Sequence, residues 1–239
     1  MKGGSVSATD AGRLNVAVDG PAGAGKSTIA RMLAERLGII YIDTGAMYRA
    51  CAVKAIRAGI PLDDEPRLER MMLQTRIDFV PVGQVQRVML DGEDVTEAIR
   101  TPDATRGSSD IARSRAVRGR LVEMQRGIAR SADVVMDGRD IGSVVLPDAP
   151  YKFFLTATDE VRATRRLMEN RQKGTGLQEY EEVLSDLRYR DRQDSTRELS
   201  PLLRVPDAVL IDTSCMDADA VVEKILEYIL KGRAGSGTP

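Results

Sequence analysis

Three glycines, a lysine and two hydroxyl residues stand near the start of the chain at the spacing of a phosphate-binding loop. The stretch Gly20-Pro21-Ala22-Gly23-Ala24-Gly25-Lys26-Ser27-Thr28 fits the pattern G-x-x-x-x-G-K-[ST]. Glycines let the backbone bend so that successive N–H groups point inward at a helix start and bind an anion. Lys26 adds a mobile positive charge for the outer phosphates, and Ser27 adds a hydroxyl for Mg²⁺. We therefore predict that residues 20–28 bind a nucleotide; the alternative is a glycine-rich turn before an ordinary helix.

A second polar group, Asp137-Gly138-Arg139-Asp140, follows an apolar run. An apolar run that ends in Asp beside a phosphate loop is the usual place for a carboxylate that orients Mg²⁺. The guanidinium of Arg139 suits a phosphate, and Asp140 suits either the arginine or a sugar hydroxyl. We predict that Asp137 serves the metal and that Arg139 and Asp140 serve a substrate.

A third group is Thr44, Tyr48 and Arg49. Thr44 and Tyr48 are four residues apart and share a helix face, with Arg49 beside them. This hydroxyl, phenol and guanidinium suit a second phosphorylated ligand. A helix N-cap at Thr44 with a surface arginine explains the same residues equally well.

Arginines crowd a later segment that we predict to be a lid. Arg162, Arg165, Arg166 and Arg171 fall on one predicted helix, and Lys173-Gly174-Thr175-Gly176 follows as a mobile tip. Beyond it, Arg190, Asp194 and Arg197 share one helical face if the helix persists. A solvated charged face is the alternative, but arginines on both sides of a glycine hinge are typical of a lid that closes over phosphates. Phosphoryl transfer needs positioning and positive charge rather than imidazole chemistry, which agrees with a chain that has no histidine.

The elements that must position these residues form an alternating pattern. Five short apolar runs predict strands at 14–19, 39–43, 133–137, 151–156 and 208–212, and helical patterns lie at 26–37, 46–58, 114–129, 159–172, 179–191 and 217–230. Consecutive apolar positions are typical of strands buried on both faces. We predict an α/β fold with a five-stranded parallel sheet covered by helices on both faces. Four strands end in Asp (19, 43, 137 and 212), where ligands of such sheets bind; capping of the next turn is the alternative for each.

One region interrupts the alternation. Residues 76–82 and 84–90 are β-like runs joined at Gly83, and a turn at Asp91-Gly92 leads to residues 93–96. This pattern predicts a small antiparallel meander inserted in the α/β core. We place the insert at about 62–100, the helical lid at about 158–197 and the whole core at 13–231, with flexible ends at 1–12 and 232–239.

Composition narrows the class of protein. Lys plus Arg is 35 and Asp plus Glu is 36, which argues against a general nucleic-acid binder. The two cysteines, Cys51 and Cys215, have no paired spacing, which suits a reducing cytoplasm and gives no zinc motif. No apolar run approaches the roughly 20 residues that span a bilayer. We expect a cytoplasmic protein with neither a membrane nor a nucleic-acid polymer as partner.

Together these motifs resemble the bacterial cytidylate kinases, a branch of the nucleoside-monophosphate kinases within the P-loop proteins, over about residues 14–230. The most specific pieces are the loop with the preceding Asp19, residues 43–49, residues 137–142, residues 147–155, and Arg190-Asp191-x-x-Asp194-x-x-Arg197 with Pro201-Leu202. The resemblance implies that ATP and CMP or dCMP give ADP and CDP or dCDP, in pyrimidine nucleotide metabolism. It also implies Mg²⁺ with the ATP, and a monomer.

The resemblance assigns roles by position. Residues 20–28 would hold ATP, and the positions that would hold CMP are Thr44, Tyr48, Arg49, Ser109, Arg118, Arg139, Asp140, Arg190, Asp194 and Arg197. Among these, Ser109 and Arg118 match groups near the cytosine. Arg139 with Arg190 matches a phosphate clamp, and Asp194 with Arg197 matches a sugar and base-side contact. The catalytic cations would be Lys26, Arg139, Arg165 and Arg166. The chain departs from the family at Arg115, where a proline is usual, which should affect only a helix start.

Two kinds of alternative function stay open at this point. One is a P-loop kinase for another small acceptor, such as UMP, shikimate or dephospho-coenzyme A. The other is a GTPase-like switch, which would need N-K-x-D and D-x-x-G motifs. Neither motif occurs, and neither Asn15 nor Asn170 precedes a lysine.

Overall fold

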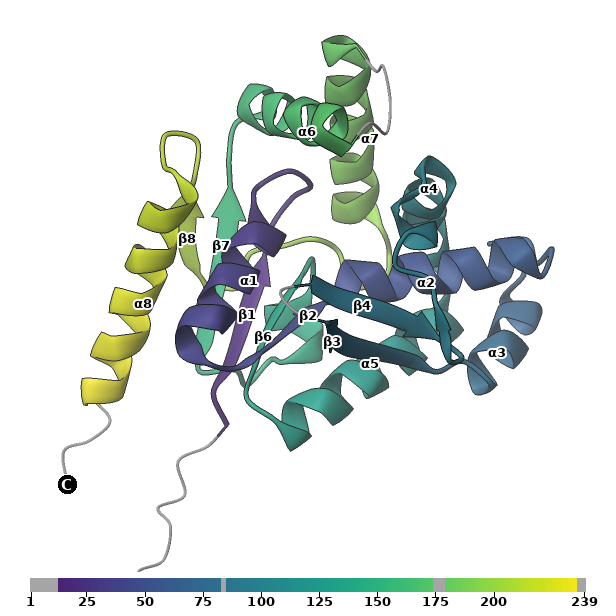
Figure 1. Ribbon diagram of the computed structural model, residues 1–239, viewed down its shortest axis with the longest axis horizontal. Helices are drawn as coiled ribbons and strands as arrows, with labels where there is room; N and C mark the ends of the chain where they lie inside the picture. Colours follow the sequence, from purple (N-terminus) through teal and green to yellow (C-terminus); the bar gives the residue numbers. More distant parts are fainter. Residues whose placement is uncertain (1–12, 83–84, 174–178, 236–239) are drawn as a thin grey trace, which may run out of the picture.

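The core of the computed structural model is a five-stranded parallel sheet (Figure 1). The structure describes residues 13–82, 85–173 and 179–235. Its strands, in the order β2-β6-β1-β7-β8, are β2 (Ile40–Asp43), β6 (Val134–Gly138), β1 (Asn15–Asp19), β7 (Tyr151–Thr156) and β8 (Val209–Asp212). Every pairing is parallel. All five predicted strands are confirmed to within one residue at each end.

Helices cover both faces of this sheet. The helices of the described residues are α1 (Lys26–Leu37), α2 (Thr44–Arg57), α3 (Glu65–Leu73), α4 (Pro102–Ile111), α5 (Arg115–Ser131), α6 (Asp159–Lys173), α7 (Tyr180–Thr196) and α8 (Ala218–Gly235), with a short 3₁₀ turn at Ala98–Arg100 and a π-helical turn at Ile141–Val145. Val16 and Val18 face a core shared with α1 and α8. Ala17 faces the opposite core, shared with α2 and α5. Alternate side chains of one strand are thus buried on opposite faces, which explains the unbroken apolar runs.

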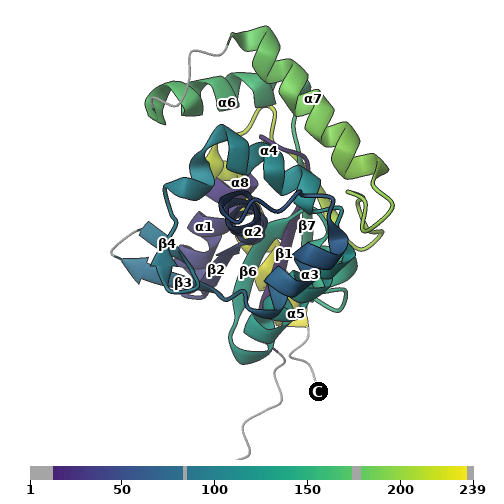
Figure 2. The ribbon, with the colours of Figure 1, turned by 90° about the vertical axis from the view of Figure 1, so that its right-hand side faces the viewer.

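The predicted meander is confirmed as a three-stranded antiparallel sheet of β3 (Ile77–Val82), β4 (Val85–Leu90) and β5 (Glu93–Asp94). Figure 2 shows it at one side of the parallel sheet. Val88 and Leu90 pack into the core of α2. The side chain of Gln86 donates to the backbone oxygen of Tyr41 at 2.8 Å, which ties the insert to β2.

Helices α6 and α7 form a hairpin above the carboxyl ends of the strands (Figures 1 and 2). A small apolar core joins Ala163 of α6 to Leu184 and Leu187 of α7, with Ala22 of the phosphate loop. Helix α7 persists to Thr196, as the spacing of Arg190, Asp194 and Arg197 requires. The predicted tip at 174–176 lies outside the described residues, as does the predicted extension at 1–12. Helix α8 continues to Gly235, past Gly232, where we predict the tail to begin.

Three features differ from the predicted elements. Helices α3 and α4 are additional, and each is short, with a proline in its first turn behind a capping Asp64 or Thr101. Helix α2 begins at Thr44 rather than at Ala46. The expected N-cap at Thr44 is wrong, because Asp43 caps the helix and accepts the N–H of Ala46 at 2.8 Å. Thr44 lies inside the helix, and its hydroxyl donates to the backbone oxygen of Asp137 at 2.7 Å.

Candidate active site

The phosphate loop connects β1 to α1 and depends on glycines at its close approaches. Gly20 has φ +144°, and a Cβ there would lie 2.0 Å from the backbone oxygen of Leu155 on β7. Gly23 has φ +77° and is covered by Arg162 of α6. Lys26 is buried, and its Nζ donates to the carbonyl of Pro21 at 2.7 Å. The loop therefore wraps its own lysine at the N-terminus of α1, where an anion is favoured.

A hydroxyl and a carboxylate meet at the base of the loop. Ser27 Oγ donates to Asp137 Oδ2 at 2.8 Å, and the Tyr41 hydroxyl donates to Asp137 Oδ1 at 2.9 Å. Burial raises the pKa of Asp137, and the nearby charge of Asp43 raises it further. The sequence predicts Ser27 and Asp137 as neighbours, and the structure brings them together. Tyr41 was not predicted, because only the pairing of β2 with β6 places its side chain on Asp137.

Asp19 joins the loop to the segment that follows β6. Its Oδ1 accepts the N–H of Ile141 at 2.9 Å, and its Oδ2 accepts the N–H of Gly142 at 2.7 Å. Strand register sets Asp19 opposite Gly138. Burial raises the pKa of Asp19 to about 6. Two segments far apart in the chain are thus fixed to one another directly at the site.

Arg139 lies between the loop and the hairpin. Its Nε donates to Asp194 Oδ2 of α7 at 2.7 Å. Burial lowers the pKa of Lys26, and the positive charge of Arg139 lowers it further. Burial alone would raise the pKa of Asp194, but Arg139 offsets this and holds it below the ordinary value. The positive charges of Lys26 and Arg139 therefore act on the same part of the site.

Arg190 adds a further cation at this place. Its Nε is buried and has no hydrogen-bond partner among the described residues. Burial lowers the pKa of Arg190 to about 10, and the charges of Arg139, Arg166 and Arg49 contribute to the shift. A buried guanidinium surrounded by like charges is stabilised by an anion placed among them.

A polar network extends from Arg139 toward α5. Arg118 and Asp140 form an ion pair in which both side chains are buried. Arg197 lies 3.8 Å from Asp140 and 3.7 Å from Asp194. The Arg118 guanidinium also lies over the Tyr48 ring, 5.6 Å from its centroid. Residues predicted to hold one ligand are thus gathered from α2, α5, α7 and the end of β6.

The remaining predicted residues lie around this network in other contacts. Arg49 of α2 pairs at 2.9 Å with Asp43, the N-cap of the same helix. Arg165 donates to the hydroxyl and the carbonyl of Thr213, at 2.9 and 2.6 Å. Arg166 pairs with Glu169 at 2.9 Å within α6.

Ser109 is half-buried on α4. Among the described residues, no hydrogen bond or ion pair joins it to Arg118 or Asp140.

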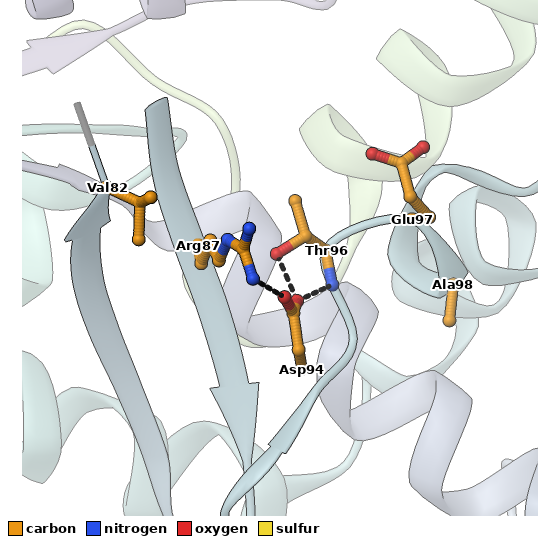
Figure 3. Close-up of a pocket in the computed structure, with 6 residues that line it drawn as sticks. All are labelled: Val82, Arg87, Asp94, Thr96, Glu97 and Ala98. Atoms are coloured by element: carbon orange, nitrogen blue, oxygen red, sulfur yellow. Dashed lines mark hydrogen bonds and ion pairs between the residues drawn. The ribbon is translucent and has the colours of Figure 1, made fainter. Parts of the chain in front are cut away.

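A separate hollow of about 540 Å³ lies on the insert (Figure 3). It is lined by Val82, Arg87, Asp94, Thr96, Glu97 and Ala98. Arg87 and Asp94 form an ion pair at 3.0 Å, and Thr96 binds the same carboxylate. None of the six is among the predicted site residues, and we do not place the chemistry there.

Two kinds of feature are absent from the part of the chain that the structure describes. In residues 13–82, 85–173 and 179–235, no helix has the length and apolar character needed to span a bilayer. Over the same ranges, no three acidic, cysteine or histidine side chains are grouped so that they could bind a metal ion.

The sequence and the fold of this chain are similar to those of known proteins. Residues 16–231 match the family model described as Cytidylate kinase. A cytidylate kinase of Pelotomaculum thermopropionicum is 50% identical over 220 residues, which cover 92% of this chain and 97% of the relative. A cytidylate kinase of Caldicellulosiruptor bescii is 47% identical over 219 residues, 92% of this chain and 96% of the relative. An uncharacterized protein from Eubacterium ventriosum has a similar fold: its solved structure has a TM-score of 0.52 at 15% identity, covering 92% of this chain and 99% of that chain.

Proposed function

This chain belongs to the cytidylate kinase family. We propose that its phosphate loop and the polar network around Arg139 each bind one of the two substrates of a phosphoryl transfer. The enzyme transfers the γ-phosphoryl group of ATP to CMP or dCMP and releases ADP and CDP or dCDP. In our proposal, residues 20–28 bind ATP. The network around Arg139, Asp140 and Asp194 binds the nucleoside monophosphate.

The observation that carries this division is the closeness of Lys26 and Arg139. They follow neighbouring parallel strands, β1 and β6, and the positive charge of Arg139 lowers the pKa of the buried Lys26. A phosphate on Lys26 and a phosphate on Arg139 would therefore meet end to end. This is the arrangement that in-line transfer requires.

The chemical step needs little from the protein beyond cations. An ionised phosphate oxygen of CMP attacks the γ-phosphorus of ATP, and the bond to the β–γ bridging oxygen breaks. The attacking oxygen carries no proton, so no general base is needed. Lys26, Arg139, Arg165 and Arg166 neutralise the charge of the moving group, and Arg190 holds the acceptor phosphate with Arg139.

The donor set beneath the loop fits Mg²⁺. The ion prefers oxygen ligands and is bound in kinases through one or two protein groups, substrate phosphates and water. The adjacent Ser27 hydroxyl and Asp137 carboxylate provide such groups. When bound, Mg²⁺ would neutralise charge on the outer phosphates. Ser27 would hold it, and Asp137, kept in place by Tyr41, would orient its water.

The remaining residues would recognise the nucleoside. We assign Ser109 and Arg118 to the cytosine side, with Asp140 holding Arg118 in place. Asp194 and Arg197 would contact the sugar and the base side, and Thr44, Tyr48 and Arg49 would complete this site from α2. We further propose a monomer in the cytoplasm, which is compatible with the two free thiols, Cys51 and Cys215. The family match gives no support to shikimate or dephospho-coenzyme A as the acceptor, or to a role as a non-catalytic switch.

The first test is an acceptor series. ADP release from ATP with Mg²⁺ is measured with CMP, dCMP, UMP, AMP and GMP offered in turn. We expect turnover with CMP and dCMP to exceed that with AMP and GMP. If a purine monophosphate is the best acceptor, the assignment of the acceptor site is wrong.

The second test is Arg139→Ala. Removing the guanidinium should lower kcat/KM for CMP by about 100-fold or more, because two charge-assisted contacts to the acceptor phosphate are lost. The Kd for ATP, measured by calorimetry, should change less than about threefold. Arg106→Ala, on the exposed face of α4, is the matched control and should leave both values unchanged. Near-normal turnover in Arg139→Ala would refute the clamp.

A further inference from the structure

Arg162 lies at the base of α6 and is buried, and it is not among the cations that we assign to the phosphoryl transfer. Its side chain is 4% exposed. The guanidinium donates to the backbone oxygen of Ala22 at 2.9 Å and to Asp191 Oδ2 of α7 at 2.5 Å, and it also pairs with Asp159. Arg188 completes the group from outside, with its Nε 2.8 Å from Asp159. A buried guanidinium with this many partners has a single defined position.

Asp191 reaches the same loop residue from the other helix of the hairpin. Its Oδ1 accepts the N–H of Ala22 at 3.3 Å, and its Oδ2 accepts from Arg162. Both backbone polar groups of Ala22 are therefore bound by a single ion pair. One partner of that pair comes from α6 and the other from α7.

The backbone of α6 lies directly against the phosphate loop at this contact. A Cβ at Gly23 would lie 3.1 Å from Arg162 Cβ and 3.2 Å from the Arg162 carbonyl, so α6 is in direct contact with the loop. The Ala22 side chain packs against Ala163, Leu184 and Leu187. Apolar packing and ion pairing thus hold the same residue.

The two ion-pair residues stand next to the cations of the hairpin. Arg162 is one helical turn before Arg165 and Arg166 on α6, and Asp191 directly follows Arg190 on α7. A rigid contact at Ala22 therefore sets the positions of three arginines relative to the backbone that would hold the ATP phosphates.

We propose that Arg162 and Asp191 are positioning residues, which register both helices of the hairpin on Ala22 so that Arg165, Arg166 and Arg190 meet the transferring phosphoryl group. Neither residue touches the substrates. Their contribution lies in the alignment of charge on the moving group and in the exclusion of water from it. The inference rests on the proposed roles of the three arginines.

The experiment compares three variants with the wild-type enzyme. Arg162→Lys keeps the charge but loses the fork between Asp191 and the Ala22 carbonyl. Asp191→Asn keeps an acceptor for the Ala22 N–H but loses the ion pair. The double variant Arg162→Met/Asp191→Leu replaces the pair by apolar side chains of similar size. ADP and CDP are quantified in the same reaction, because their ratio reports how much phosphoryl group is lost to water.

We expect the double variant to lose about 100-fold in kcat with less than about a threefold change in KM for ATP and for CMP. Its ratio of ADP to CDP should rise at least about tenfold, since water then competes for a poorly aligned γ-phosphoryl group. The two single variants should fall between it and the wild type. Arg188→Gln is the matched control, because it breaks the outer ion pair to Asp159 without touching Ala22, and its ADP to CDP ratio should equal that of the wild type.

The ratio separates a positioning role from a merely structural one, because a smaller folded fraction lowers both products equally. An unchanged ratio in Asp191→Asn and Arg162→Lys, with kcat near wild type, would overturn the proposal even if the double variant fails to fold. Failure of the proposed function itself is a different result: the wild-type enzyme would then form no CDP at all.

Discussion

Asp19 connects the phosphate loop to the turn that follows β6 through one side chain. Each carboxylate oxygen accepts one backbone N–H of the turn after Asp140, and the next residue, Gly20, begins the phosphate loop. The carboxylate is almost completely buried, so its ionisation in the folded state is opposed. Asp19 holds the phosphate loop and the turn after Asp140 together, and its contribution to the free energy of unfolding depends on pH.

That pH dependence can be measured. The pKa of Asp19 is raised by burial to about 6 from 3.8, so between these values the folded protein binds a proton that the unfolded chain does not. The contribution of Asp19 to stability should therefore fall as the pH rises from about 4 to about 6 and stay constant above that range.

We expect wild type to lose up to about 3 kcal/mol relative to Asp19→Asn over this range. Urea unfolding of both proteins at several pH values gives the difference. A difference in the free energy of unfolding that is independent of pH would contradict a buried, ionisable Asp19.

Single residues could be predicted from the sequence where spacing alone defines them. The glycines, Lys26 and Ser27 occupy fixed places in the loop pattern, and Asp137 follows from its position at a strand end. Tyr41 could not be predicted, because its contact with Asp137 depends on the pairing of two strands far apart in sequence. The expected N-cap of α2 at Thr44 is wrong, because Asp43 and Thr44 are both good capping residues. The hydroxyl of Thr44 binds the backbone oxygen of Asp137 instead, and Asp43 caps the helix.

Helix α5 shows how a local signal places a predicted site residue. Ser114 caps it by accepting the N–H of Val117 at 3.2 Å, and Arg118 follows one turn later. The cap is buried, so the N–H of Val117 that it accepts has no access to water.

Ser114→Ala should therefore lower the free energy of unfolding by about 1 kcal/mol. The kcat/KM for CMP should stay within about twofold of wild type, because the packing of α5 still places Arg118. Thermal and denaturant unfolding give the first value, and the coupled assay gives the second. Ser131→Ala, at the exposed end of the same helix, is the control. If both substitutions lower the free energy of unfolding equally, the side-chain cap of Ser114 does not stabilise α5.

Elements with strong apolar patterns were predictable, and those without were not. The five strands have consecutive apolar residues, and each is found within one residue of its expected ends. Helix α4 buries mainly small residues, among them Ala104, Gly107 and Ser108, and so lacks the stripe that identifies a helix. The π-helical turn at Ile141–Val145 follows from Asp19 accepting two N–H groups, which is a tertiary effect.

The order of strands in the sheet was not predictable, although the fold class was. The alternation of strand and helix patterns along the chain indicates a parallel α/β sheet, but it does not say which strands are neighbours. The observed order puts β1 between β6 and β7. This order brings the loop after β1 beside Arg139 after β6, and it brings the start of α6 after β7 over the same loop. The two halves of the site are thus a consequence of the whole topology.

The central claim is that two nucleotides lie end to end between the phosphate loop and Arg139. The most direct measurement is the affinity, by calorimetry, of an analogue in which adenosine and cytidine are joined through a pentaphosphate bridge. Since one molecule would fill both sites, it should bind at least about 100-fold more tightly than ATP or CMP alone, and Arg139→Ala should remove most of that advantage. An analogue that binds no more tightly than ATP, with the Kd unaffected by Arg139→Ala, would contradict the account.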